Sequence, residues 1–211
     1  MKIVLLGAPN SGKGSTATRL SSYYNVPHIS TGDIFRRLAE EGSELGVKAR
    51  DMYWKHGKLV PDDITIKLVE EMLTKPEYQK GFIMEGFPRT VDQAKALDDI
   101  LHRDYMLINL DVSDETLQDR VEGRIVCSNK KCSAIYHVRN MPPKQEGICD
   151  KCRSPLYKRE DDKPEVFKQR LEVYNKQTKP VLKYYKKRVI HVSGEDNVDS
   201  IVARIKQVIG N

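Results

Sequence analysis

The sequence lacks any apolar run near the roughly 20 residues of a membrane span. Its N-terminal apolar segment stops at Gly7 without the small-residue cleavage pattern of a signal peptide. Internal repeats and low-complexity segments are also missing. Aromatic residues make up only 7% of the 211 residues, with Trp54 the one tryptophan, which gives little support to base stacking on nucleic acid. These absences predict a soluble, cytoplasmic protein with no membrane attachment and no nucleic-acid partner.

Charged residues, by contrast, are plentiful. Lys and Arg number 36 against 30 Asp and Glu, a net charge of +6 that suits polyanionic ligands without specifying one. A chain of this length can bury one substantial core plus a small inserted unit. We interpret the basic run KYYKKR, Lys183–Arg188, as the solvated cationic end of a helix rather than a nucleic-acid contact.

A glycine-rich stretch, GAPNSGKGS (Gly7–Ser15), follows the apolar run KIVLL. Its spacing, a glycine, four residues and then Gly12-Lys13, matches a phosphate-binding loop between a strand and a helix. The residue after Lys13 is Gly14, so the hydroxyl comes one place later, at Ser15. Such a loop presents backbone N–H groups and the positive end of a helix dipole to phosphate. The stretch predicts a nucleoside triphosphate site, with an ordinary strand-to-helix turn as the alternative.

Four further apolar runs predict buried strands, at residues 26–30, 81–85, 105–112 and 188–193. Amphipathic helical patterns lie between them, which predicts an α/β fold with a five-stranded parallel sheet and helices on both faces. Two segments interrupt the alternation. Residues 31–60 are helical and charged, and residues 122–159 are rich in Cys, Pro, Lys and Gly. Both are predicted insertions at the carboxyl edge of the sheet, where α/β proteins place ligands.

All four cysteines fall in one window, Cys127-x4-Cys132-x16-Cys149-x2-Cys152. Disulfides are disfavoured in a cytoplasmic protein, and two close cysteine pairs are typical of one tetrahedral zinc site. Four thiolate ligands leave no position for water, so the predicted Zn²⁺ is structural. It would stiffen a segment with few large apolar residues of its own. A redox or incidental role for the cysteines is the alternative.

The order of these motifs resembles the adenylate kinase family, in its bacterial long form with a cysteine-bearing lid. The resemblance covers essentially the whole chain and rests on GAPNSGKGS, STGDIFR (30–36), GKLVPDD (57–63), EGFPRTVDQ (85–93), DRVEGRIVC (119–127), YHVRNMPPK (136–144) and YKREDDKPE (157–165). It implies a P-loop kinase-type sheet and reversible phosphoryl transfer from MgATP to AMP, giving two ADP. It also implies a monomer with a core domain (1–29, 61–121 and 161–211), a domain that binds the nucleoside monophosphate (30–60) and a lid domain (122–160).

By the resemblance, catalysis rests on charge stabilisation of the transferred phosphoryl group. The residues implied are Lys13, Arg89, Arg124, Arg159 and Arg170. A guanidinium can hold two phosphate oxygens and stays charged. The nucleophile would be the AMP phosphate, whose second pKa is about 6, so no general base is needed.

Two nucleotide sites are implied in the same way. The ATP site would comprise Asn10, Ser11, Gly12, Lys13, Gly14, Ser15, Arg120, Arg124, Ile135, Tyr136 and Asp196. The AMP site would comprise Thr31, Arg36, Lys58, Leu59, Val60, Gly86, Phe87, Pro88, Arg89, Gln93, Arg159 and Arg170. Mg²⁺ would be held mostly by phosphate oxygens and water, with three side chains oriented towards them: Ser15, Asp33 and Glu85.

The resemblance leaves some assignments open. Gln93 could contact adenine or, three residues after Thr90, complete a capping box at a helix start. Glu85 stands where the family usually has Asp, and Ile125 where a second Arg commonly follows Arg124. Two other functions also remain: a sister kinase acting on UMP or CMP, or using GTP as donor, and a zinc-ribbon nucleic-acid binder with the triphosphate as a regulatory ligand.

Overall fold

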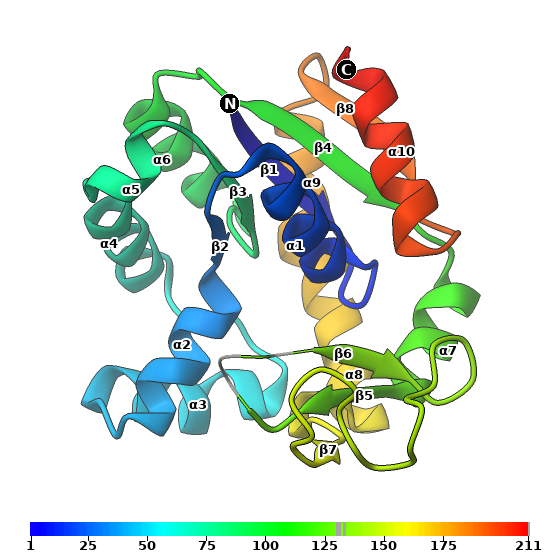
Figure 1. Cartoon of the computed structure of the whole chain (residues 1–211). Coiled ribbons are helices and arrows are strands. Elements are labelled where there is room, and N and C mark those ends of the chain that lie inside the picture. Colours follow the sequence, from blue (N-terminus) through cyan, green and yellow to red (C-terminus); the bar gives the residue numbers. More distant parts are fainter. Residues whose placement is uncertain (130–131, 133, 211) are drawn as a thin grey trace.

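The computed structural model describes residues 1–129, 132 and 134–210, and its centre is a five-stranded parallel sheet (Figure 1). The strands are β1 (Lys2–Gly7), β2 (His28–Ser30), β3 (Phe82–Glu85), β4 (Met106–Asp111) and β8 (Val189–Ser193), in the order β2-β3-β1-β4-β8. All neighbouring pairs are parallel. The predicted sheet is confirmed: four strands lie within their apolar runs, and β1 extends one residue beyond its run, to Gly7.

Helices cover both faces of the sheet. Ile3 and Leu5 of β1 pack with α1 (Lys13–Tyr24) and α10 (Val198–Val208), which lie on the near face in Figure 1. Val4 and Leu6 point to the other face, which α4 (Asp62–Leu73), α6 (Val91–Leu101) and α9 (Lys179–Tyr184) cover. Because successive side chains of a strand alternate between faces, burial on both sides explains why the strand is apolar throughout.

The first predicted insertion is helical, as expected. It contains α2 (Thr31–Glu40), α3 (Glu44–Met52) and a 3-10 turn at Trp54–His56. The short helix α5 (Pro76–Gln79) lies later in the chain, between α4 and β3. In Figure 1 the α2–α3 segment lies beyond the carboxyl ends of the sheet strands.

The second insertion follows α7 (Asp114–Gly123) and contains a small antiparallel sheet that the sequence did not predict. Its strands are β5 (Arg124–Cys127), β6 (Ile135–His137) and β7 (Leu156–Tyr157), in the order β6-β5-β7. The chain returns through a 3-10 turn (Glu160–Asp162), α8 (Pro164–Val173) and a π-helical turn (Tyr174–Thr178) to α9. The predicted domain boundaries at 29/30, 121/122 and 160/161 fall inside elements, and the division into domains stays a prediction.

Two local predictions have different outcomes. The Thr90 hydroxyl caps α6 by accepting a hydrogen bond from the backbone N–H of Gln93, so the predicted helix start is confirmed. The basic run 183–188 does include a helix end, but the prediction of full solvation is wrong at two positions. Tyr185 is buried in the core, and Arg188 pairs with the buried carboxylate of Asp98 at 2.7 Å. Separately, none of the described helices has the length and apolar character needed to cross a bilayer.

Candidate active site

The two insertions and the carboxyl ends of the sheet strands line a cleft with a volume of about 1380 Å³. The predicted nucleotide-binding and magnesium-shell residues line it, with two exceptions. The side chains of Ser11 and Phe87 are fully buried, Ser11 inside the glycine-rich loop and Phe87 in the core behind β1 and β3. The structure therefore brings nearly all of the predicted residues to one cavity.

The glycine-rich loop is shaped as a phosphate-binding loop requires. Gly7 has φ +142°, and a Cβ there would lie 2.7 Å from the Ser11 hydroxyl, so glycine is required. Helix α1 begins at Lys13 without a side-chain cap, which leaves its first backbone N–H groups available to an anion. The Lys13 ammonium bends back to donate to the Ala8 carbonyl at 2.5 Å and the Ser11 hydroxyl at 3.1 Å.

The charge of Lys13 is poorly compensated. Burial lowers its pKa to about 7, and repulsion from Arg89, Arg170 and Arg124 acts in the same direction. Glu85 acts against the shift but is outweighed. An anion in the cleft would therefore stabilise the charged form of Lys13.

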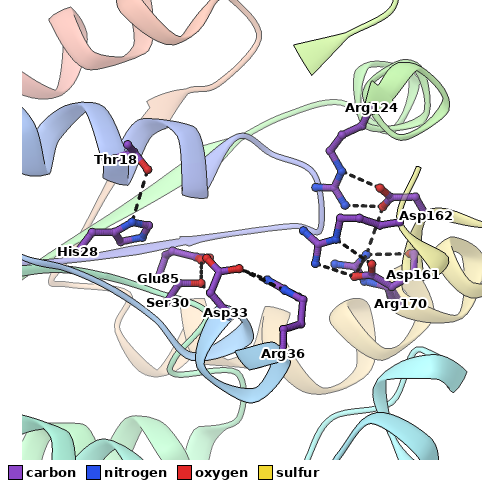
Figure 2. A network of polar contacts seen from close by, with 11 residues as sticks. Thr18, His28, Ser30, Asp33, Arg36, Glu85, Arg124, Asp161, Asp162 and Arg170 are labelled. Carbon is purple, nitrogen blue, oxygen red and sulfur yellow. Dashed lines mark hydrogen bonds and ion pairs between the residues drawn. The ribbon is translucent and has the colours of Figure 1, made fainter. Parts of the chain in front are cut away.

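A second polar group lies where β2 and β3 end, next to α2 (Figure 2). The Ser30 hydroxyl donates to Glu85 and accepts from the Asp33 amide N–H. The Asp33 carboxylate accepts from Arg36 at 2.5 Å. Burial raises the pKa of Asp33, but the Arg36 guanidinium outweighs it and holds that pKa below its usual value. Two predicted magnesium-shell carboxylates thus lie together at the cleft, and Arg36 is paired with one of them.

Arginines from three segments converge on the turn at Glu160–Asp162 (Figure 2). Arg124 pairs with Asp162 through two hydrogen bonds, and Arg159 pairs with Asp161 in the same way. Arg170 contacts both carboxylates, at 3.1 and 3.7 Å. Burial alone would raise the pKa of Asp161, but Arg159 and Arg170 hold it well below its usual range. Burial nevertheless lowers the pKa of Arg170 to about 10, and three guanidinium groups share only these two carboxylates.

Arg89 differs from these arginines because no carboxylate among the described residues pairs with it. Its Nε donates to the Gly86 carbonyl at 2.8 Å, and burial lowers its pKa. Gly86 has φ +86°, and a Cβ there would meet the Thr31 hydroxyl at 2.6 Å. The turn between β3 and α6 therefore needs glycine to bring Arg89 close to Thr31 at the cleft.

Arg120 binds backbone rather than acids. Its guanidinium donates to the Ser11 carbonyl at 3.2 Å and to the carbonyls of Gly194, Glu195 and Asp196, at 2.6, 3.2 and 3.1 Å. These bonds tie α7 to the glycine-rich loop and to the turn before α10. The predicted ATP residues Arg120 and Asp196 are thus side by side in the structure.

The four cysteine sulfur atoms all lie within 4.8 Å of one another. The pairs Cys127–Cys152 and Cys132–Cys149 are 3.3 and 3.7 Å apart, close to the roughly 3.8 Å expected between thiolates bound 2.3 Å from one metal ion. Burial opposes ionisation of Cys149, but hydrogen bonds from Tyr136 and from nearby backbone amides lower its pKa to about 6. This donor set fits a metal ion that prefers sulfur, such as zinc.

Several residues of the site were missed by sequence reasoning. Asp161 and Asp162 stand in a quoted motif, and the need to neutralise the nearby arginines was a usable signal. His137 lines the cleft and its Nε2 lies 3.0 Å from the Asp119 carbonyl. Tyr136 was predicted for the ATP site, but its contact with a cysteine was not: its hydroxyl lies 3.5 Å from the Cys149 sulfur. No spacing in the sequence pointed to the last two roles.

Comparison with known proteins agrees with this geometry. The family model described as "Adenylate kinase" matches residues 5–190. Proteins named adenylate kinase are similar over nearly their whole length. One from Geobacillus sp. (strain WCH70) is 44% identical over 100% of this chain and 99% of its own. Others from Methanocella arvoryzae and Acetivibrio thermocellus are each 46% identical, over 99% and 97% of this chain and 98% and 96% of their own.

Proposed function

The chain belongs to the adenylate kinase family of phosphotransferases, and from that membership we propose that it transfers the γ-phosphoryl group of MgATP to AMP, reversibly, giving two ADP. ATP would occupy the part of the cleft formed by the glycine-rich loop and the second insertion. AMP would occupy the part formed by α2, the start of α4 and the turn at Gly86–Arg89. Cytoplasmic location and a monomeric state remain predictions.

One observation carries this proposal: Lys13, Arg89, Arg124, Arg159 and Arg170 surround one cleft, and burial lowers the pKa of four of them, whereas nearby carboxylates outweigh burial and raise the pKa of Arg159. Phosphoryl transfer needs two anionic groups held in line and the charge on the transferred group neutralised. Buried, fixed cations do this with little reorganisation at the moment of reaction. The AMP phosphate is the nucleophile and is already ionised near neutral pH, so the chain needs no general base.

Two metal ions belong to the proposal. Ser15, Asp33 and Glu85 line the cleft and would hold Mg²⁺ through its waters. When bound, Mg²⁺ neutralises phosphate charge. The four cysteines would hold a structural Zn²⁺, which leaves no open coordination position. Because the small sheet β6-β5-β7 has only a few buried residues, the ion would brace it as a unit that can close over the nucleotides and exclude water.

A coupled assay for ADP from ATP and AMP, with and without Mg²⁺, tests the proposal. We expect ADP to form with AMP present and to require Mg²⁺. Supplying CMP, UMP and GMP in place of AMP, and GTP in place of ATP, tests nucleotide choice. A protein that phosphorylates no monophosphate would contradict the reaction, and equal rates with all of them would contradict the assignment of AMP.

A further inference from the structure

Asp62 holds a small hydrogen-bond network next to the proposed AMP site. It is the first residue of α4, and its Oδ1 accepts from the Gln93 Nε2 at 2.7 Å. Its Oδ2 accepts from the Thr90 hydroxyl at 2.6 Å. Gln93 in turn accepts with its Oε1 from the Arg89 backbone N–H at 2.7 Å. The network thus joins the first turns of α4 and α6 to the turn that carries Arg89.

These contacts fix which way the Gln93 amide faces. An ionised carboxylate can only accept, so Asp62 must face the NH₂ group of Gln93, and a backbone N–H can only donate, so Arg89 must face the oxygen. A flipped amide would place oxygen against oxygen and NH₂ against N–H. Gln93 is only 2% exposed and lies 2.7 Å from both partners, which leaves no room for a water between the flipped amide and either of them.

The amide still has hydrogen-bonding capacity for a ligand. It has two N–H hydrogens and two oxygen lone pairs, and the network uses one of each. Gln93 lines the cleft, so the remaining hydrogen and lone pair are a donor and an acceptor for what binds there. An adenine offers the matching edge, since N1 accepts and the 6-amino group donates. Hypoxanthine and guanine have a proton on N1 and an oxygen at position 6, and mismatch at both.

We infer that Asp62 is a positioning residue for base selection: it locks the Gln93 amide in the orientation that accepts amino bases and rejects oxo bases. The inference rests on the proposed function, because it concerns the base of the nucleoside monophosphate. It also predicts a limit, because cytosine presents the same acceptor and amino group as adenine. The fixed orientation of the Gln93 amide distinguishes AMP from IMP and GMP by hydrogen bonding. It cannot distinguish AMP from CMP, which differ at this site only in the size of the base.

The test is a competition between AMP and IMP in one mixture with ATP as donor. At equal concentrations of AMP and IMP, the ratio of the initial rates at which the two monophosphates are consumed reports the ratio of kcat/KM values, because the donor ATP yields ADP in both reactions. This ratio does not depend on how much of a variant is folded. In Asp62→Ala the amide is held by Arg89 alone, and we expect the preference for AMP over IMP to fall about tenfold. Asp62→Ser should show a similar loss, because a hydroxyl can face either end of the amide.

Two further variants distinguish the orientation of the Gln93 amide from two other effects of Asp62, namely its negative charge and its contribution to the stability of α4. Asp62→Asn can still accept from Gln93 with its Oδ1 and donate to Thr90, so its preference should stay within about threefold of the parent protein. Asp63→Ala removes an exposed carboxylate from the same first turn of α4 and should leave the preference unchanged.

The outcomes are distinct. An unchanged preference in Asp62→Ala and Asp62→Ser overturns the inference, as does an equal loss in Asp63→Ala or in Asp62→Asn. If the parent protein makes no ADP from ATP and AMP, the proposed function itself fails. If the parent protein prefers AMP and the Asp62 variants keep that preference, only the inference fails.

Discussion

The cations of the cleft fall into two sets that differ in their partners. Lys13 begins α1, and Arg89 lies in the turn between β3 and α6. Within the described residues, these two side chains donate to neutral oxygens of Ala8, Ser11 and Gly86. Arg124, Arg159 and Arg170 come from the second insertion and α8, and each forms an ion pair with Asp161 or Asp162 (Figure 2).

The difference indicates two ways of keeping positive charge ready for phosphate. The first set forms no ion pair within the described residues and feels only the longer-range attraction of carboxylates such as Glu85. A phosphate group would therefore be its first ion-pair partner. The second set is largely compensated, because its three guanidinium groups share two carboxylates, which position the guanidinium groups and reduce their mutual repulsion. Phosphate would share or replace those carboxylates, so each arginine of the second set should contribute less to binding than Lys13.

The largest effect is expected at Lys13. Lys13→Ala should lower kcat by about 100- to 1000-fold, the usual cost of losing one buried group that stabilises transition-state charge. The melting temperature should not fall, because removing a desolvated and poorly paired cation costs the fold little. The ADP assay and a thermal melt measure both. Lys95→Ala, which removes an exposed lysine, is the matched control. Near-normal turnover in Lys13→Ala would contradict the role of Lys13 in stabilising the charge of the transferred phosphoryl group.

The next largest effect is expected at Asp162, whose side chain is fully buried. Asp162→Ala would leave Arg124 without its paired carboxylate and Arg170 with Asp161 alone. It should cost about 3 kcal/mol of unfolding free energy. Saturating ATP should restore part of this loss, because its phosphates supply the missing negative charge. Thermal melts with and without ATP test the prediction.

The neighbouring variant Glu160→Ala removes an exposed carboxylate and serves as the control. If both variants melt at the temperature of the parent protein, the carboxylates do not hold the second set in place.

Removing the metal should act on the second set alone. Arg124 begins β5, the strand that ends in Cys127, so loss of the ion loosens its surroundings without reaching Lys13. Chelation or Cys149→Ser should lower the melting temperature by about 5 °C or more. We expect turnover per folded molecule to fall less than in Lys13→Ala. Purified protein that contains no metal would contradict the zinc assignment.

The smallest expected effect is the uptake of a proton by Lys13 when ATP binds. In the free protein burial lowers the Lys13 pKa to about 7, and bound phosphates should raise it again. ATP binding should therefore make Lys13 take up nearly one proton at pH 8.5 but only about a tenth of a proton at pH 6, where the lysine is already mostly charged. Affinity for ATP should fall as pH rises above 7. Calorimetry in two buffers of different ionisation enthalpy measures the uptake, and Lys13→Met should abolish it.

Sequence reasoning predicted the sheet and the glycine-rich loop because their signals are local. A strand buried on both faces is an apolar run, and the loop from Gly7 to Ser15 has its glycines and lysine in a fixed spacing. The small sheet β6-β5-β7 was missed because its strands are only two to four residues long and are stabilised by cysteines rather than by apolar periodicity.

Partners distant in sequence could not be predicted from spacing. Asp162 is 38 residues from Arg124, and Asp62 is 31 residues from Gln93. Arg188 was interpreted as solvated because the sequence around it is basic, whereas its partner Asp98 lies 90 residues away. For Gln93, the structure shows a third use of the amide, with Asp62 and Arg89, that neither the adenine contact nor the capping box had included.

The adjacency of Asp161 and Asp162 has a consequence for how the chain can vary. These two consecutive residues, on one short turn, form ion pairs with three arginines: Arg124, Arg159 and Arg170. The number of residues in the turn therefore fixes where both carboxylates meet all three guanidinium groups. Inserting or deleting a single residue in this turn would misalign all three pairs together. We therefore expect the loops near the cysteines to accept changes of length, while this turn accepts substitutions on its exposed side but no change of length.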